Sequence, residues 1–172
     1  MIPQQAVIDA TAAQAQTGVS DLAAALALAV AGPETGYSYN PSEPGDYMLG
    51  GQIVLKETPG AIPTSWGYTQ LHTNAGGDGG GVGNGHSVAE LTNGVSNLAI
   101  AMAEIQRRLN AGDDAYGALE PWSTRDQAIA QLPEAQAALG SDISRGIPGS
   151  GVDGAAIALA GILGLAAWVL FG

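Results

Sequence analysis

The sequence contains no cysteine and only five lysines and arginines, and both shortages exclude classes of function. Without cysteine the chain forms no disulfide, no thiolate-bound zinc site and no cysteine nucleophile. Against the five basic residues stand 16 aspartates and glutamates, so the formal net charge is −11. A chain with so few cations cannot neutralise many phosphates, and we therefore expect no nucleic-acid partner.

Aromatic residues make up only 5% of the chain, and much of the 46% that is hydrophobic is alanine. Because alanine buries little area per residue, this composition predicts a small, mainly helical core. A length of 172 residues suits one domain with an appendage and excludes a large multidomain protein. We expect the domain at residues 1–145, a flexible linker at 146–154 and a hydrophobic helix at 155–172.

The segment at residues 155–171, AAIALAGILGLAAWVLF, carries no charged or strongly polar side chain. As a helix extended to Gly172 it would be about 27 Å long, close to the thickness of a bilayer core. It predicts a membrane anchor, and the alternative is a buried helix in an oligomer or a virion shell. The anchor residues would include Ile157, Leu163, Trp168 and Phe171. The first residues of the chain lack a positively charged region before an apolar run, so we expect no secretory signal.

Two stretches have the apolar pattern of helices. Residues 20–31 are apolar nearly all round after Ser20, a residue suited to capping, which is typical of a helix buried in a core. Residues 87–109 place apolar side chains three and four positions apart, with a break near Asn93 and Gly94. They predict one or two amphipathic helices.

A third helix is predicted from Ser123 to about Leu139. The capping sequence WST begins it, and Gly140 should end it. Because proline removes a helical hydrogen bond, Pro133 should kink or divide this helix.

Residues 41–86 form a long irregular insert that is rich in glycine and proline. One run, QIVLKET at 52–58, predicts a strand that pairs in a short β-hairpin after Gly50 and Gly51. The run GGDGGGVGNG at 76–85 lacks the lysine and the preceding strand of a phosphate-binding loop, so we interpret it as a mobile loop. The predicted fold is mainly α, of the α+β class, with a short β-hairpin insert and a C-terminal hydrophobic helix.

Two histidines, His72 and His86, flank the glycine-rich run and would need Asp78 to form a metal site. Two histidines without the spacing of helical ligands are weak grounds for a metal, so we interpret them as ordinary loop residues. We expect neither a metal nor a cofactor.

The segment GPETGYSYNP, residues 32–41, places Glu34 just past an apolar helix and before a polar, aromatic turn. A carboxyl group in that position can be partly desolvated, which raises its pKa as a general acid near neutral pH requires. An acidic residue near a helix end is, by itself, more often a solvated surface group. The residues around Glu34 and downstream of it favour the catalytic interpretation.

Those residues fall into four ordered blocks. The first is Glu34, Thr35, Gly36 and Tyr37, followed by Asn40 and Pro41. The second lies in SWGYTQLH and contributes Ser65, Gly67 and Gln70. The third consists of the glycine-rich loop from Gly76, the residues from Ser87 to Leu91, and Asn97. The fourth is a late aromatic residue, Tyr116 or Trp122.

This order and spacing resemble the lysozyme-like lytic transglycosylases, the glycoside hydrolases that include soluble lytic transglycosylase and goose-type lysozyme, and especially the compact versions in bacteriophage virions. The resemblance covers about residues 18–135. It implies a lysozyme-like fold and cleavage of the bond between N-acetylmuramic acid and N-acetylglucosamine in peptidoglycan. Glu34 would protonate the glycosidic oxygen and then act as the base toward an internal hydroxyl or water.

The resemblance also implies a set of substrate-binding residues: Ser65, Tyr68, Gln70, Tyr37, Asn97 and Tyr116. Gln70 would bind N-acetyl and hydroxyl groups through its amide, with Tyr68 and Ser65 beside it. For Asn97 a structural role is favoured, in which it anchors the loop before its helix. Aromatic side chains, including Trp122, would stack on sugar faces or belong to the core.

The insert before the second block is longer than in compact members and carries three carboxylates, Glu43, Asp46 and Glu57. If one of them lay about 6.5–9.5 Å from Glu34, it would activate water and make the enzyme an inverting lysozyme instead of a transglycosylase. We choose Asp46 as the possible second carboxylate, because it precedes the predicted hairpin.

These features predict a virion-associated phage enzyme that opens the host cell wall during genome entry. Its partners would be peptidoglycan glycan strands, together with a lipid membrane or a virion assembly that the C-terminal helix contacts. A host-lysis enzyme is an alternative with the same chemistry. Two alternatives from other classes are an inactive lysozyme-like protein, serving as a structural or sugar-binding module of the virion membrane, and a pore-forming, holin-like protein.

Overall fold

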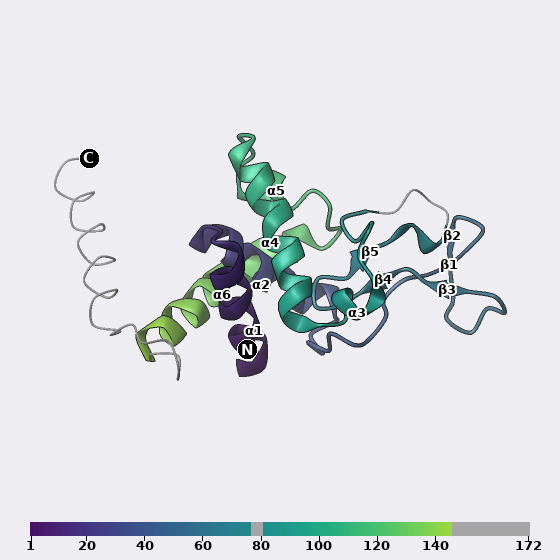
Figure 1. Ribbon diagram of the computed structural model, residues 1–172, viewed down its shortest axis with the longest axis horizontal. Helices are drawn as coiled ribbons and strands as arrows, with labels where there is room; N and C mark the ends of the chain where they lie inside the picture. The colour runs from purple at the N-terminus through teal and green to yellow at the C-terminus, as the bar shows by residue number, and fades with distance from the viewer. Residues whose placement is uncertain (77–80, 146–172) are drawn as a thin grey trace.

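A helix made largely of alanine, leucine and valine lies at the centre of the protein. In the computed structural model, which describes residues 1–76 and 81–145, this helix is α2 (Asp21–Glu34) (Figure 1). The Ser20 hydroxyl caps its start by accepting a hydrogen bond from the Ala23 N–H (3.3 Å). Every residue from Ala23 to Gly32 is buried, as expected for a helix without a polar face. The predicted buried helix is confirmed.

Three longer helices surround α2. α1 (Gln4–Thr17) and α4 (Gly94–Asn110) pack on α2 and on each other, and α6 (Arg125–Arg145) packs along it. A short helix, α5 (Ala115–Ala118), follows α4. The sequence pattern did not predict α1, because its buried residues are mostly alanines that form no strong apolar stripe. Their small size lets the neighbouring helices approach closely.

α6 is longer than predicted. It begins at Arg125, close to the expected start, and continues through Pro133 and Gly140 to Arg145. The predicted end at Gly140 is therefore wrong, and Pro133 does not divide the helix. Packing along α2 stabilises the helix. This stabilisation offsets the cost of the hydrogen bond that proline removes and the entropy cost of ordering glycine.

The predicted break near Asn93 separates α3 (Val88–Leu91) from α4. Ser87 and Glu90 form a reciprocal capping box at the start of α3. At the start of α4, the Asn93 side-chain oxygen accepts a hydrogen bond from the Ser96 N–H (3.0 Å). Each helix has its own cap, so of the two alternatives, one helix or two, the structure has two.

The insert forms short strands and a single turn of 3₁₀ helix. They are β1 (Tyr47–Leu49), β2 (Gln52–Val54), β3 (Ile62–Pro63), β4 (Ser65–Trp66), β5 (Leu71–His72) and η1 (Asn74–Gly76). β1 pairs antiparallel with β2 and β3, and β4 pairs antiparallel with β5. Gly50 and Gly51 turn the chain between β1 and β2 with φ values of 60° and 79°, as a type I′ hairpin turn requires. The predicted hairpin is confirmed, although β2 ends at Val54.

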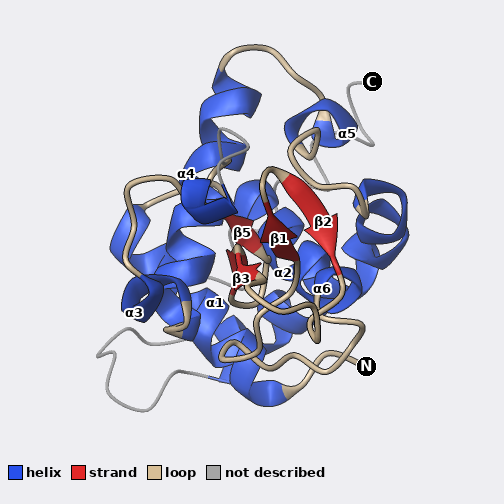
Figure 2. Ribbon diagram, turned by 90° about the vertical axis from the view of Figure 1, so that its right-hand side faces the viewer, coloured by secondary structure: helices blue, strands red, loops and turns tan. Residues whose placement is uncertain are grey.

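The longer helices and the β1–β3 sheet occupy opposite ends of the molecule (Figure 1). In the view along that direction, the strands lie in front of the helices (Figure 2). The fold is therefore mainly helical with small antiparallel sheets, which confirms the α+β class. The chain passes from one part to the other directly after α2.

The predicted linker at 146–154 and the predicted anchor helix at 155–172 lie outside the described residues. The same holds for the four anchor residues, Ile157, Leu163, Trp168 and Phe171. Within residues 1–76 and 81–145, no helix combines the length and the apolar character needed to cross a bilayer.

Candidate active site

Glu34 is the last residue of α2, and the chain turns sharply behind it. In this turn φ is positive at Gly36 (55°), Tyr37 (66°) and Tyr39 (49°). A positive φ is ordinary for glycine but uncommon for tyrosine, which carries a side chain. The Thr35 hydroxyl holds the turn by donating to a carbonyl in the last turn of α2 (2.7 Å) and accepting from the Tyr39 N–H (3.0 Å). The buried helix and this turn together fix Glu34 where the helices meet the insert.

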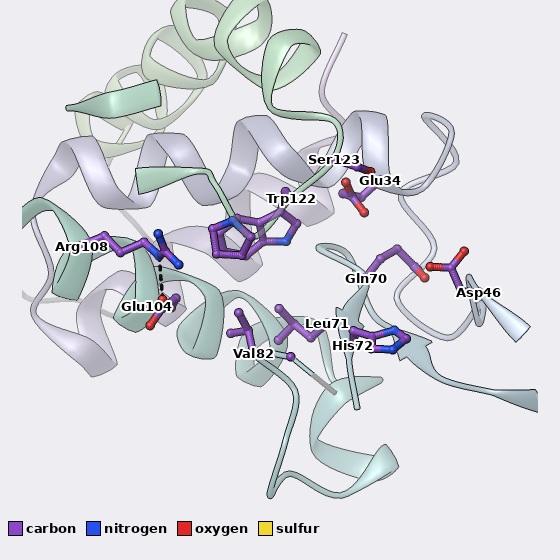
Figure 3. Close-up of a pocket in the computed structure, with 12 residues that line it drawn as sticks. Glu34, Asp46, Gln70, Leu71, His72, Val82, Glu104, Arg108, Trp122 and Ser123 are labelled. Carbon is purple, nitrogen blue, oxygen red and sulfur yellow. Dashed lines mark hydrogen bonds and ion pairs between the residues drawn. The ribbon is translucent and has the colours of Figure 1, made fainter. Parts of the chain in front are cut away.

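A cleft of about 680 Å³ opens beside Glu34 (Figure 3). One end holds Glu34, Asp46 and Gln70, with Ser123 and His72 beside them. The opposite end holds an ion pair in which Arg108 Nε donates to Glu104 Oε1 (2.8 Å). Between the two ends lie the apolar side chains of Leu71, Val82 and Trp122. The volume is that of a site for a small molecule or a short segment of a polymer.

The Glu34 carboxyl has a raised pKa. Burial is the main cause, because a half-buried carboxylate loses solvation by water. Hydrogen bonds from the hydroxyl and the backbone of Thr124 lower the pKa, whereas the negative charge of Asp46 raises it further. The negative end of the α2 dipole also disfavours a carboxylate at this position. Glu34 therefore keeps its proton to a higher pH than an exposed glutamate does.

Asp46, the possible second carboxylate of the sequence analysis, lines the same cleft as Glu34. The Asp46 N–H donates to Ser65 Oγ (2.7 Å), and its carbonyl accepts from the Thr64 N–H (2.9 Å). Ser65, which was predicted to bind substrate, is 2% exposed and does not line the cleft; its hydroxyl positions Asp46. Of the other carboxylates in the insert, Glu43 borders a small hollow next to the cleft, and Glu57 lines neither.

Gln70 reaches the cleft from the turn between β4 and β5, where its own φ is 46°. Its amide nitrogen donates to the carbonyls of Gly67 (2.8 Å) and Glu43 (3.2 Å), which ties this turn to the segment that carries Asp46. Its amide oxygen is buried and has no hydrogen-bond partner among the described residues. Gly45 makes room for the amide, because a Cβ there would collide with that oxygen. The Gln70 amide therefore packs against Gly45 at the polar end of the cleft.

Asn97, for which a structural role was favoured, is fully buried and does not line the cleft. Its amide oxygen accepts from the N–H (3.0 Å) and the hydroxyl (2.9 Å) of Thr69. Its amide nitrogen donates to the carbonyls of Trp66 and Leu91, each at 3.0 Å. These bonds fasten the β4–β5 turn, which carries Gln70, to the start of α4.

Tyr68 and Tyr37 were also predicted to bind substrate, and neither lines the cleft. Tyr68 is 2% exposed, and its hydroxyl donates to Asp9 of α1 (2.9 Å), so it anchors the β4–β5 turn to the helices. Tyr37 is 57% exposed in the turn after α2. Neighbouring positions in the sequence placed both near catalytic groups, but their side chains point elsewhere because each lies in a tight turn.

The two late aromatic residues, Tyr116 and Trp122, lie in different places. Trp122 lines the cleft, and its indole N–H donates to the Thr69 carbonyl (2.8 Å). Tyr116 does not line the cleft, and its ring instead contacts the guanidinium of Arg125, 4.6 Å from the ring centroid.

Several residues at the site were not predicted from the sequence, among them Thr124, Glu104 and Arg108. Thr124 belongs to WST, which was interpreted only as a helix cap. α6 packs along α2 with its start beside the end of α2, and this packing brings Thr124 to Glu34. Glu104 and Arg108 are four residues apart, a spacing that predicts a helical ion pair but does not reveal that the pair faces a cleft.

The histidines occupy different places. His72 lines the cleft, and its carbonyl accepts from the N–H groups of Gly81 (3.1 Å) and Gly83 (2.9 Å), which brings Val82 over the cleft. His86 lines a neighbouring groove, and Asp78 lies outside the described residues. Within the described part of the chain, no three acidic or histidine side chains are grouped so that they could hold a metal ion.

Comparisons of the chain with protein-family models, with curated proteins and with solved structures find no match. A fold by itself does not identify an activity in any case, because one architecture hosts many reactions. The function is therefore inferred from the chemistry of the cleft.

Proposed function

We propose that this protein cleaves the β-1,4 glycosidic bond between N-acetylmuramic acid and N-acetylglucosamine in peptidoglycan, with Glu34 as general acid and base. The observation that carries the proposal is a half-buried carboxyl with a raised pKa, beside a cleft of about 680 Å³. Acid-catalysed glycoside cleavage needs a carboxyl group that stays protonated near neutral pH. The resemblance of the sequence to lysozyme-like lytic transglycosylases supports peptidoglycan as the substrate.

In the first step, the Glu34 carboxyl donates its proton to the glycosidic oxygen. The bond from that oxygen to the anomeric carbon breaks, the leaving sugar departs as an alcohol, and positive charge develops on the remaining ring. The Thr124 hydroxyl stabilises the Glu34 carboxylate that forms. Asp46 contributes a second carboxyl group to the cleft, and its negative charge favours the positively charged intermediate.

In the second step, the Glu34 carboxylate accepts a proton from the attacking nucleophile. If the 6-hydroxyl of the muramic acid attacks, the product is a 1,6-anhydro sugar and the protein is a lytic transglycosylase. If water attacks, the product has a reducing end and the protein is a lysozyme. We propose the transglycosylase, because one acid–base residue is sufficient for that reaction.

The cleft suits a glycan, which presents apolar ring faces and polar edges. Leu71, Val82 and Trp122 form the apolar middle, where sugar faces would lie. The polar end, with Glu34, Asp46 and Gln70, would face the acetamido and hydroxyl groups of the sugars. A polymer that places acetamido groups at regular intervals satisfies both features.

Mass spectrometry of the fragments released from purified peptidoglycan by the full-length protein tests the proposal. Wild type should release soluble muropeptides, and Glu34→Gln should release none. Anhydro products would establish a lytic transglycosylase. Reducing-end products would establish a hydrolase, and Asp46→Asn should then abolish their release. Absence of Glu34-dependent products on several wall types would refute the proposal and favour an inactive sugar-binding or structural module.

The Glu34→Gln variant is a clean control because it should fold at least as well as wild type. The folded-state pKa of Glu34 lies above its unfolded value, so the folded protein binds this proton more tightly. Stability is therefore lost as pH rises from the unfolded pKa through the folded pKa. Glutamine does not ionise, and it can still accept the hydrogen bond from Thr124. If Glu34→Gln loses cleavage but keeps its stability at neutral pH, the loss is due to the missing acid and not to unfolding.

The place of action is a second part of the proposal. The protein would be carried in a phage particle, and its apolar segment at residues 155–171 would contact a membrane. This part rests on the sequence, since the segment lies outside the described residues. Flotation of the full-length protein with liposomes in a density gradient tests it. A protein that stays at the bottom of the gradient while soluble and monomeric without detergent would contradict the anchor.

A further inference from the structure

Ser123 lines the cleft and has no part in the two proposed steps of cleavage. It is exposed, and Figure 3 shows it at the Glu34 end of the cleft. The next residue, Thr124, bonds to the Glu34 carboxyl through both its hydroxyl and its backbone. Ser123 is therefore adjacent in the chain to a residue that contacts the proposed acid directly.

The segment that carries Ser123 is held on both sides. Before it, the buried Trp122 donates its indole N–H to the Thr69 carbonyl (2.8 Å). After it, the Thr124 carbonyl accepts from the Ala128 N–H (3.0 Å), which joins the segment to α6. A residue between two anchored neighbours is already ordered, so a ligand that binds to it has little ordering cost to overcome.

The Ser123 hydroxyl has no structural task in the described part of the chain. Within residues 1–76 and 81–145 it makes no hydrogen bond, so it caps neither α6 nor a turn, the usual tasks of a serine in front of a helix. A serine hydroxyl can donate one hydrogen bond and accept two. At Ser123 all of this capacity faces the cleft, where a ligand can use it.

We infer that the Ser123 hydroxyl binds the polar edge of the sugar ring that packs on Trp122, and that it holds this sugar with its glycosidic oxygen toward Glu34. The inference rests on the proposed function and adds a substrate-binding residue to it. Consecutive Cα atoms lie about 3.8 Å apart, so a ring on Trp122 is within reach of the next side chain. The hydroxyl and acetamido groups at the ring edge can donate to a serine hydroxyl and accept from it. A contact this close to the breaking bond orients the sugar for proton transfer.

Ser123→Ala in the full-length protein tests the inference, with soluble peptidoglycan strands as the substrate. Loss of one hydrogen bond between neutral groups should lower kcat/KM for cleavage by about two- to tenfold. When Ser123→Ala is added to Glu34→Gln, which binds without turnover, binding of the same strands should weaken by a similar factor. Ser123→Thr keeps a hydroxyl and should retain most of the cleavage and of the binding.

Three controls separate a contact with the sugar from other effects. Ser123→Ala should leave the free energy of unfolding unchanged, because the hydroxyl makes no hydrogen bond within the described residues. It should also leave the alkaline limb of the pH profile of kcat/KM in place, whereas a residue that acts through the pKa of Glu34 would move that limb. Ser42→Ala makes the same change at an exposed serine that lines neither the cleft nor the small hollow next to it, and its cleavage and binding should equal those of wild type.

Unchanged cleavage and binding in Ser123→Ala would overturn the inference and leave the proposed function intact. An equal loss in Ser123→Ala and Ser42→Ala would also overturn it. Slower cleavage with unchanged binding and a displaced alkaline limb would overturn it as well, because Ser123 would then act through Glu34 and not on the sugar. No cleavage by wild type, together with no binding by Glu34→Gln, would overturn the proposed function and the inference with it.

Discussion

Replacing Asn97 with alanine should lower the free energy of unfolding by about 3–5 kcal/mol. The side chain is fully buried and makes four hydrogen bonds, with Thr69, Trp66 and Leu91. Alanine removes all four bonds and leaves their partners inside the protein. Because these bonds join the β4–β5 turn to α4, the loss should also loosen the turn that presents Gln70 to the cleft.

The magnitude follows from the groups that lose a partner. A typical hydrogen bond contributes about 0.5–1.5 kcal/mol net, so four bonds account for about 4 kcal/mol. Buried groups left without a partner cost about 1–3 kcal/mol each, which would increase the effect. A water molecule that enters the vacated space would bind some of the freed groups and reduce it. The expected range allows for both corrections.

Chemical denaturation followed by circular dichroism measures the effect, with Asn93→Ala as the matched control. Asn93 precedes Asn97 by about one helical turn, is exposed, and makes one capping bond to the Ser96 N–H (3.0 Å). Loss of that cap should cost about 1 kcal/mol. The two variants should share the denaturant dependence of wild type. If Asn97→Ala costs no more than Asn93→Ala, the reasoning that Asn97 joins the two parts of the protein is refuted.

Two further predictions concern the cleft. Thr124→Val removes a hydroxyl that stabilises the Glu34 carboxylate, so the pKa of Glu34 should rise further. The alkaline limb of the pH profile of kcat/KM for wall cleavage should then move to higher pH. An unchanged limb would contradict the assignment of Glu34 as the acid. Gly45→Ala should displace the Gln70 amide and weaken glycan binding by the Glu34→Gln protein by about tenfold, measured by titration with soluble peptidoglycan strands. Unaltered binding would exclude Gln70 from the sugar site.

Some elements could be predicted from the sequence because short-range patterns determine them. The buried helix at 21–34 follows from a run of apolar residues behind a serine cap. The break before α4 follows from the caps at Ser87 and Asn93. The hairpin turn follows from two adjacent glycines, which alone adopt positive φ without strain.

Other elements could not be predicted, because packing with distant segments overrides local preference. α1 has a weak apolar pattern and is helical because its alanines fit between neighbouring helices. α6 continues past Pro133 and Gly140, two residues that usually interrupt helices, because it packs along α2. In both places the local sequence favours a different secondary structure from the one that tertiary packing stabilises.

The sequence by itself determined that Glu34 ends an apolar helix and that Asp46 and Gln70 follow it in a polar insert. Only the tertiary structure decided which side chains share the cleft. It placed Thr124, 90 residues away in the chain, against Glu34, and it buried Ser65 behind Asp46. The physical reason is that the solvation and pKa of a carboxyl depend on every group packed around it, and segments far apart in the chain supply most of those groups.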